Sequence, residues 1–249
     1  MNFNRVFLVG AGLSLSVLLA GVVNAGVVVV DYTVDLGGKN TEPLNGLAAR
    51  ATWDIDGTTL TITLENTSTG IPKGFEASDQ LVVSLGFNLP EGNSISSGDS
   101  ALIGPGSIGL GDWSDRGPGD SVGEEWLWTN EFGGDIMEAW RQILSTSNGQ
   151  NGGDHMTFDG KLNGDVDGPF GGIAADPPFI SIPSNRRAVS DSIVFSLTLA
   201  STLTFDELSS VANGAIVEFG SDMQYLGAPA PGALGLLAMA GILGRRRRR

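Results

Sequence analysis

Two runs of alternating side chains, joined by a glycine turn, constrain the fold of this chain more than any other feature. Residues 47–66 read LAARATWDIDGTTLTITLEN, with apolar side chains at every second position: Ala49, Ala51, Trp53, Ile55, Leu60, Ile62 and Leu64. A period of two is that of a β-strand with one buried face. Asp56-Gly57 between the runs is a hairpin signal, because glycine accepts the positive φ of a tight turn. The segment predicts an antiparallel hairpin over an apolar core.

Four further segments carry strand patterns: VVVVDYTVDL at 27–36, DQLVVSLGFNLP at 79–90, DSIVFSLTLAS at 191–201 and GAIVEFGS at 214–221. The second and third alternate clearly, with one apolar face each: Leu81, Val83, Leu85, Phe87 and Leu89, then Ile193, Phe195, Leu197 and Leu199. Several strands with one apolar and one Thr/Ser face predict an all-β fold, mainly an antiparallel β-sandwich, over residues 26–226.

Two segments depart from the strand pattern. GDIMEAWRQILS at 134–145 has helical spacing of Ile136, Met137, Trp140, Ile143 and Leu144, which predicts one short amphipathic helix. Residues 145–190 are rich in Gly, Asn, Asp and Pro, with few periodic apolar positions. They predict a long Gly/Asp-rich surface loop or strand-poor excursion.

Cysteine content and charge exclude several classes of protein. The chain has no cysteine, which excludes disulfides, thiolate metal sites, cysteine nucleophiles and the acylated cysteine of a lipoprotein. It has 14 Lys and Arg against 28 Asp and Glu. Arg5 and Arg245–Arg249 lie in terminal segments without acids, which leaves 8 basic residues and a net charge of −20 for residues 26–228. Phosphate groups repel so acidic a body, which argues against binding to nucleic acid.

Residues 1–25 have the pattern of a secretory signal peptide. Arg5 supplies the early positive charge, residues 6–23 are an apolar stretch, and Val23-Asn24-Ala25 has small or apolar residues where a signal peptidase reads. The mature chain is predicted to begin at Gly26. The alternative is an uncleaved membrane anchor, because the apolar stretch is nearly long enough to span a bilayer.

The last 23 residues, 227–249, form a second distinctive segment. Pro229 and Pro231 precede a short apolar run from Ala233 to Gly244, and five arginines follow it. As a helix, this run covers about 18 Å, less than the ~30 Å hydrocarbon thickness of a bilayer. Arginines resist translocation, so they are expected on the cytoplasmic side with everything before them outside. The segment predicts a brief membrane helix that stops export.

The order of these features resembles the PEP-CTERM sorting signal of exported bacterial proteins. The residues that carry the resemblance are Pro229, Ala230, Pro231, Gly232, Arg245, Arg246, Arg247, Arg248 and Arg249, around the short apolar helix. The family commonly has Glu between the prolines, whereas Ala230 stands there in this chain. The resemblance implies processing by a membrane enzyme of the exosortase type, transient anchoring in the inner membrane, and a final place at the cell surface or outside the cell. A plain tail anchor with a polybasic flank is the alternative.

Glutamates beside tryptophans are the first candidate for chemistry. Glu124 and Glu125 precede Trp126 and Trp128, and carboxylates next to indoles are typical of carbohydrate clefts. Adjacent strand residues point to opposite faces, so these two acids would not form a catalytic pair. A catalytic pair would need a distant partner such as Glu138 or Asp112. The other possible use of this region is a stacking platform for sugar, formed by Trp113, Trp126, Trp128 or Phe132. Exposed coplanar rings would favour a carbohydrate-binding module, whereas buried rings would favour a structural protein.

Histidine and acidic loops supply the remaining candidates. His155 is the one histidine, and no Gly-x-Ser-x-Gly motif accompanies it, which argues against a hydrolase triad. Asn163, Asp165 and Asp167 place oxygen ligands at alternate positions, as in the first half of an EF-hand loop. Ala174 stands at the twelfth position, where that loop requires a bidentate glutamate, so a weak calcium site competes with simple turn chemistry.

The sequence as a whole predicts an exported, non-enzymatic protein of the cell surface or extracellular matrix. Its expected partners are the exosortase-type enzyme, the membrane while the tail is inserted, and extracellular polysaccharide. The alternative function is a carbohydrate-binding module acting on that polysaccharide. No cofactor is expected apart from the calcium candidate.

Overall fold

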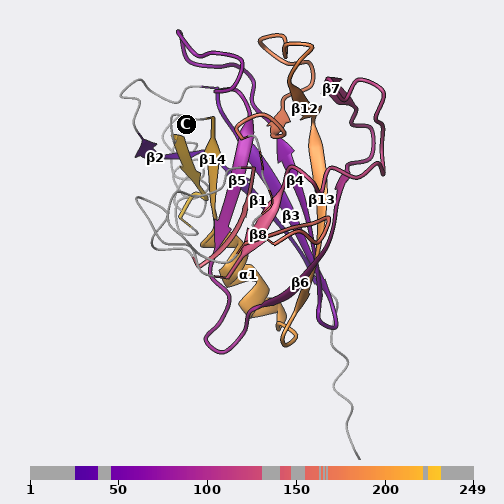
Figure 1. Cartoon of the computed structure of the whole chain (residues 1–249). Coiled ribbons are helices and arrows are strands. Elements are labelled where there is room, and N and C mark those ends of the chain that lie inside the picture. Colours follow the sequence, from indigo (N-terminus) through magenta and orange to yellow (C-terminus); the bar gives the residue numbers. More distant parts are fainter. Residues whose placement is uncertain are drawn as a thin grey trace, which may run out of the picture.

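The computed structural model describes residues 26–38, 46–130, 141–146, 155–162, 164, 166, 168–220 and 224–230. These residues form two β-sheets and one helix (Figure 1). The strands of the first sheet are β1 Val27–Tyr32, β3 Ala49–Asp56, β4 Thr59–Asn66, β6 Ile95–Ile103 and β13 Ser192–Leu199. The strands of the second are β2 Val34–Gly38, β5 Val82–Phe87, β7 Gly109–Gly111, β8 Leu127–Thr129, β9 Gln142–Ser145, β10 Met156–Thr157, β11 Ile173–Ala174, β12 Arg187–Ser190, β14 Ile216–Phe219 and β15 Gln224–Gly227. The mostly antiparallel, all-β prediction is confirmed.

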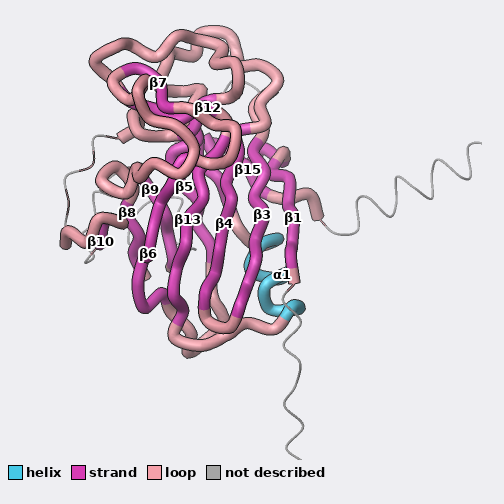
Figure 2. Tube along the Cα trace, turned by 90° about the vertical axis from the view of Figure 1, so that its right-hand side faces the viewer, coloured by secondary structure: helices cyan, strands magenta, loops and turns pink. Residues whose placement is uncertain are grey.

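The five-stranded sheet contains the hairpin predicted from the alternating runs. Its order is β1-β3-β4-β13-β6 with antiparallel neighbours, and Figure 2 shows these strands side by side. Asp56 pairs with Thr59, so the turn residues are Gly57 and Thr58, one position later than predicted. Gly57 has a φ of 60°, whereas Thr58 has no positive φ, which matches a type II′ turn.

The ten-stranded sheet is organised around β5. One path from β5 leads through β14 and β15 to β2, and β5 also pairs with β9 and β11. The predicted first strand, 27–36, divides at Thr33 between the two sheets. β1 and β2 are thus end strands of different sheets, joined by one residue.

Large aromatic side chains join the two sheets through one core. Trp53 of β3 meets Phe87 of β5 edge-on, with ring centroids 5.4 Å apart. Trp126 meets Phe195 of β13 at 4.8 Å. The alternating positions predicted for β3, β4 and β13 are all buried in this core: Ala49, Ala51, Trp53, Ile55, Leu60, Ile62, Leu64, Ile193, Phe195, Leu197 and Leu199. Face-to-face packing of the sheets gives a sandwich-like architecture.

A β-bulge corrects the predicted face of β5. Glu218 pairs with Ser84 but Phe219 pairs with Val82, so the register skips Val83. A bulge of this kind reverses which side chains face inward. Leu85 and Phe87 therefore enter the core between the sheets, whereas Leu81 and Val83 join a separate small cluster with Ala174 and Ala188.

The described end of the predicted helix is a strand, and the described residues contain a short helix at another place in the chain. Residues 142–145 of the predicted helix form strand β9, which pairs with both β5 and β8, while residues 131–140 lie outside the described residues. Both faces of β9 are buried, so its run of apolar residues does not alternate and resembles helical spacing. The helix is α1, Phe205–Asn213, with Thr204 and Glu207 in a capping box at its start.

The predicted loop over 145–190 is poor in strands, with only two to four residues in each of β10, β11 and β12. It is not entirely a surface excursion. β11 and β12 pair in parallel within the ten-stranded sheet, and Ile173 and Val189 are fully buried in the core. Because β12 also pairs with β7, this segment brings Arg187 beside the loop that follows β7.

Candidate functional site

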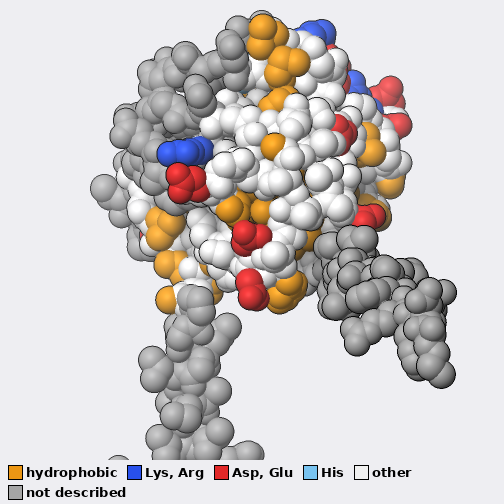
Figure 3. Space-filling view, turned by 90° about the horizontal axis from the view of Figure 1, so that it is seen from below, with side chains coloured by type: hydrophobic (Ala, Val, Ile, Leu, Met, Phe, Trp, Pro, Cys, Tyr) orange, Lys and Arg blue, Asp and Glu red, His pale blue; other side chains and the backbone are white. Residues whose placement is uncertain are grey.

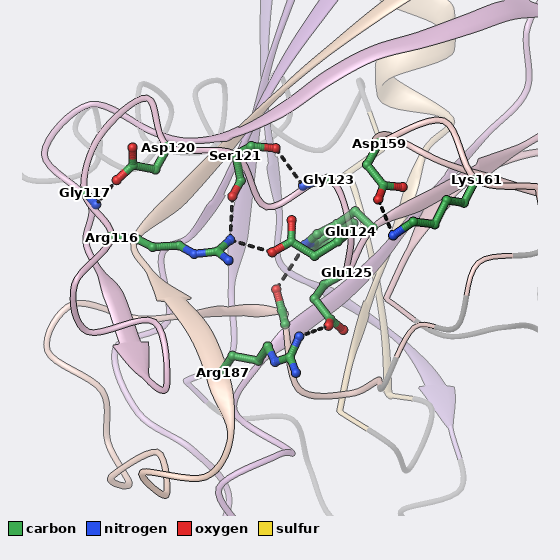
Figure 4. Close-up of polar contacts among 12 residues, drawn as sticks. Arg116, Gly117, Asp120, Ser121, Gly123, Glu124, Glu125, Asp159, Lys161 and Arg187 are labelled. Atoms are coloured by element: carbon green, nitrogen blue, oxygen red, sulfur yellow. Dashed lines mark hydrogen bonds and ion pairs between the residues drawn. The ribbon is translucent and has the colours of Figure 1, made fainter.

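The two predicted glutamates each meet an arginine. Glu124 Oε1 lies 2.6 Å from Arg116 Nη1, and both side chains are about one-third exposed. Glu125 is paired with Nη1 of Arg187 on β12, and its side chain is only 4% exposed. Figure 4 shows the two carboxylates reaching toward different arginines. We call these four residues, with Trp113, the ion-pair cluster.

Trp113 lies between the two ion pairs. The guanidinium carbon of Arg116 is 4.6 Å from the Trp113 ring centroid, and that of Arg187 is 6.0 Å from it. Both distances are those of cation–π contacts. The ring itself is 3% exposed, so the arginines and the surrounding loop cover it.

Gly111 of β7 allows the backbones of β7 and β12 to lie close together. β7 pairs with β12 so that Gly111 lies opposite Arg187. Gly111 has a φ of 65°, and an added Cβ would overlap the backbone oxygen of Arg186. After β7, the chain turns back, with the Arg116 N–H donating to Trp113 O at 2.8 Å. The cluster therefore depends on a close backbone contact that only glycine fits.

Gly111→Ala is expected to lower the free energy of unfolding by about 3 kcal/mol or more, because positive φ strain and backbone overlap both act on the variant. Gly119→Ala is the matched control, since Gly119 has a φ of 87° but open space where a Cβ would stand. Its cost is expected to be about 1 kcal/mol from strain alone. Urea unfolding followed by tryptophan fluorescence measures both. Equal losses in the two variants would contradict the role given to the β7–β12 contact.

On its buried side, the cluster contacts the turn that contains Gly171. Trp126 Nε1 donates to Gly171 O at 3.0 Å, and the Gly171 N–H donates to Arg187 O at 2.7 Å. A Cβ added at Gly171 would lie 3.0 Å from Glu125 Cβ. The Glu125–Arg187 pair thus packs against the turn that precedes β11. Each carboxylate of the cluster has a guanidinium partner.

The three predicted stacking tryptophans do not form one exposed platform in the structure. Trp113 and Trp126 are buried, and Trp128 is half-buried. Trp128 packs over the backbone of β6, where an added Cβ at Gly98 would overlap its ring. Stacking on a sugar from solution requires an accessible ring face, which Trp113 and Trp126 lack.

The other predicted site residues lie largely outside the described residues. Asn163, Asp165 and Asp167 do so, although Val166 between them is described and buried. In the described part of the chain no three His, Cys, Asp or Glu side chains gather as metal ligands. The calcium site stays a prediction.

The terminal signals also fall mainly outside the described part. Pro229 is half-buried and Ala230 is exposed after β15, whereas 1–25, Pro231, Gly232 and Arg245–Arg249 are not described. Within the described ranges, no helix has the length and apolar character needed to cross a membrane.

Glu218 on β14 is a second acidic residue of interest, and the sequence did not predict it as a site residue. It stands opposite Ser84 of β5 and Tyr225 of β15. Burial raises the pKa of Glu218 to about 7, and hydrogen bonds with Ser84 and Tyr225 act in the opposite direction. The only sequence signal is an acid in a short apolar strand, and it does not reveal the burial.

Comparison of the chain with protein-family models, with curated proteins and with solved structures gives no match. The terminal sequence signals and the geometry of the body are therefore the features that bear on function. Two features of that body matter most: an ion-pair cluster with paired charges, and a sandwich whose first and last strands adjoin the predicted signals.

Proposed function

We propose that this chain is an exported protein of the cell surface or extracellular matrix, structural or interaction-forming, sorted by its PEP-CTERM-like tail. The observation that carries the proposal is the order of segments along the chain. β1 begins at Val27, one residue after the predicted mature start, and β15 ends at Gly227, two residues before Pro229. The sandwich thus occupies the interval between the two predicted signals.

The non-enzymatic part of the proposal is supported by the ion-pair cluster. Glu124 and Glu125, the acids first considered for glycoside chemistry, are each paired with an arginine. A glycosidase instead needs two carboxyl groups facing one bond, with one acting as an acid. Burial of Trp113 and Trp126 favours the structural function over the carbohydrate-binding alternative.

Processing near Pro229 tests the proposal. In a host with an exosortase-type enzyme, the released protein is expected to begin at Gly26 and to lack Arg245–Arg249, because the arginines hold the tail at the membrane until it is cut. Intact-mass measurement on released protein checks both ends. The double variant Pro229→Ala and Pro231→Ala is expected to remain membrane-bound, whereas Pro118→Ala, in an exposed loop, is expected to be released normally. Released protein that still carries the five arginines would overturn the proposal.

A further inference from the structure

The tail leaves the sandwich beside the start of β2. The Thr33 N–H donates to Gly227 O, at the end of β15, over 3.1 Å. Ala228 packs against the core, Pro229 is half-buried and Ala230 is exposed. The body therefore holds the chain as far as Pro229.

The connection from this point to the predicted membrane segment is short. Only Ala230, Pro231 and Gly232 separate Pro229 from Ala233, where the apolar run begins. Four fully extended peptide steps reach at most about 14 Å. The head-group layer on each side of the hydrocarbon is about 5–8 Å thick. While the tail is inserted, the surface around Pro229 must therefore lie at or near the lipid head groups.

An exposed apolar pair lies on that surface. Val34 and Leu36 of β2 are 39% and 49% exposed. The pairing of β2 with β15 shifts register at Leu36, but Leu36 still lies on the face of Val34, because the Cβ position of Gly227 opposite Val34 points toward Leu36. Val34 pairs with Gly227, whose added Cβ would lie 2.9 Å from Leu36 Cδ1. Gly227 has no side chain to cover them. The carboxylate of Asp35 accepts the Gly37 N–H at 2.7 Å within the same strand.

We propose that, before processing, β2 rests with Val34 and Leu36 against the lipid head groups of the membrane that holds the tail. This inference rests on the proposed function. The fit is to a zwitterionic surface, since a body of −20 is repelled by anionic lipid. Elsewhere, in the view from below, hydrophobic side chains appear at several separate places among polar and acidic ones (Figure 3). Among the exposed large hydrophobic side chains of the described residues, Val34 and Leu36 lie on the strand that pairs with β15, from which the tail leaves.

Removal of the tail cuts the tether and leaves Val34 and Leu36 as the remaining contact of this surface with lipid. Two partly exposed side chains give too little apolar area to hold an acidic domain on a bilayer. Processing at the proline pair is therefore also the release step, and it uncovers the apolar pair for contacts outside the cell.

Single labels test this orientation, because the chain has no cysteine of its own. Leu36→Cys and Ile108→Cys each carry one environment-sensitive fluorophore on the full chain, reconstituted in phosphatidylcholine vesicles with brominated acyl chains. Ile108 is the matched control: it is apolar, 53% exposed, and precedes β7 at the opposite end of the ten-stranded sheet from β2. Quenching at position 36 is expected to exceed that at position 108 at least twofold. Equal quenching at the two positions would overturn the inference.

Flotation of the same samples distinguishes the anchoring of the tail from the orientation of β2. A full chain that floats with the vesicles has an inserted tail, and equal quenching in that sample contradicts only the orientation of β2. A full chain that does not float contradicts the anchoring itself, and with it this inference. The labels without vesicles provide the baseline for both positions.

Discussion

Replacement of Arg187 by methionine is expected to lower the free energy of unfolding by about 2–3 kcal/mol, because the buried Glu125 carboxylate would lose its partner, although Arg187 itself is one-third exposed and partly screened by solvent. The Glu125 side chain is 4% exposed and would stay buried without its guanidinium. Methionine keeps much of the apolar length of the arginine side chain, so the loss of stability comes mainly from the loss of the charge. Denaturant unfolding at neutral pH measures it.

The Arg116–Glu124 pair is the matched control within the same cluster. Its atoms are 2.6 Å apart, but both side chains are about one-third exposed. Arg116→Met is therefore expected to cost about 1 kcal/mol or less. The double variant Arg187→Met and Glu125→Gln should regain much of the stability, because no charge is then left buried. A double variant as unstable as Arg187→Met alone would show that packing, not charge, causes the loss.

The sequence predicted the strands that have one buried and one exposed face. β3, β4 and β13 lie in a sheet with a solvent-facing side, so their apolar side chains alternate and identify both the strand and its core face. β9 is buried on both faces, so its residues do not alternate and its spacing suggested a helix. Alternation thus reports on the environment of a strand as much as on its conformation.

Long-range contacts determine the parts of the site that the sequence could not predict. Arg187 lies 62 residues after Glu125, and only the insertion of β12 beside β7 brings the two together. The sequence placed Glu124 and Glu125 on opposite faces, but it could not identify their partners. The start of the helix does have a sequence signal, because Thr204 and Glu207 have the spacing of a capping box.

Stability is expected to fall as pH rises from about 4.5 to about 7, and Glu218→Gln is expected to remove most of that fall. Burial raises the folded-state pKa of Glu218 from 4.5 to about 7. Below pH 4.5 the carboxyl is protonated in both states. Between pH 4.5 and about 7, the carboxyl is ionised in the unfolded chain but still protonated in the folded one. The free energy of unfolding therefore falls over this interval and stays at its lower value above the folded-state pKa. A shift of this size corresponds to about 3 kcal/mol in total.

The measurement compares unfolding free energies of the wild type and Glu218→Gln between about pH 5.5 and pH 8.5. The difference between the two proteins is expected to grow by about 2 kcal/mol over this range, with the variant the more stable at high pH. The difference cancels contributions from other titrating groups, such as Glu65, whose pKa is also raised, mainly by burial.

Glu207→Gln provides a control of opposite sign. Hydrogen bonds from the Thr204 backbone and side chain lower the pKa of Glu207, so its stabilising contribution is present above its ordinary pKa and is lost in acid. That variant should be less stable than the wild type at neutral pH, with a difference that does not change between about pH 5.5 and pH 8.5. A constant difference for Glu218→Gln over the same range would mean that the Glu218 carboxyl titrates near its ordinary pKa. The outer face of β14 would then be open to water at that position, and its hydrogen bonds with Ser84 and Tyr225 would outweigh burial.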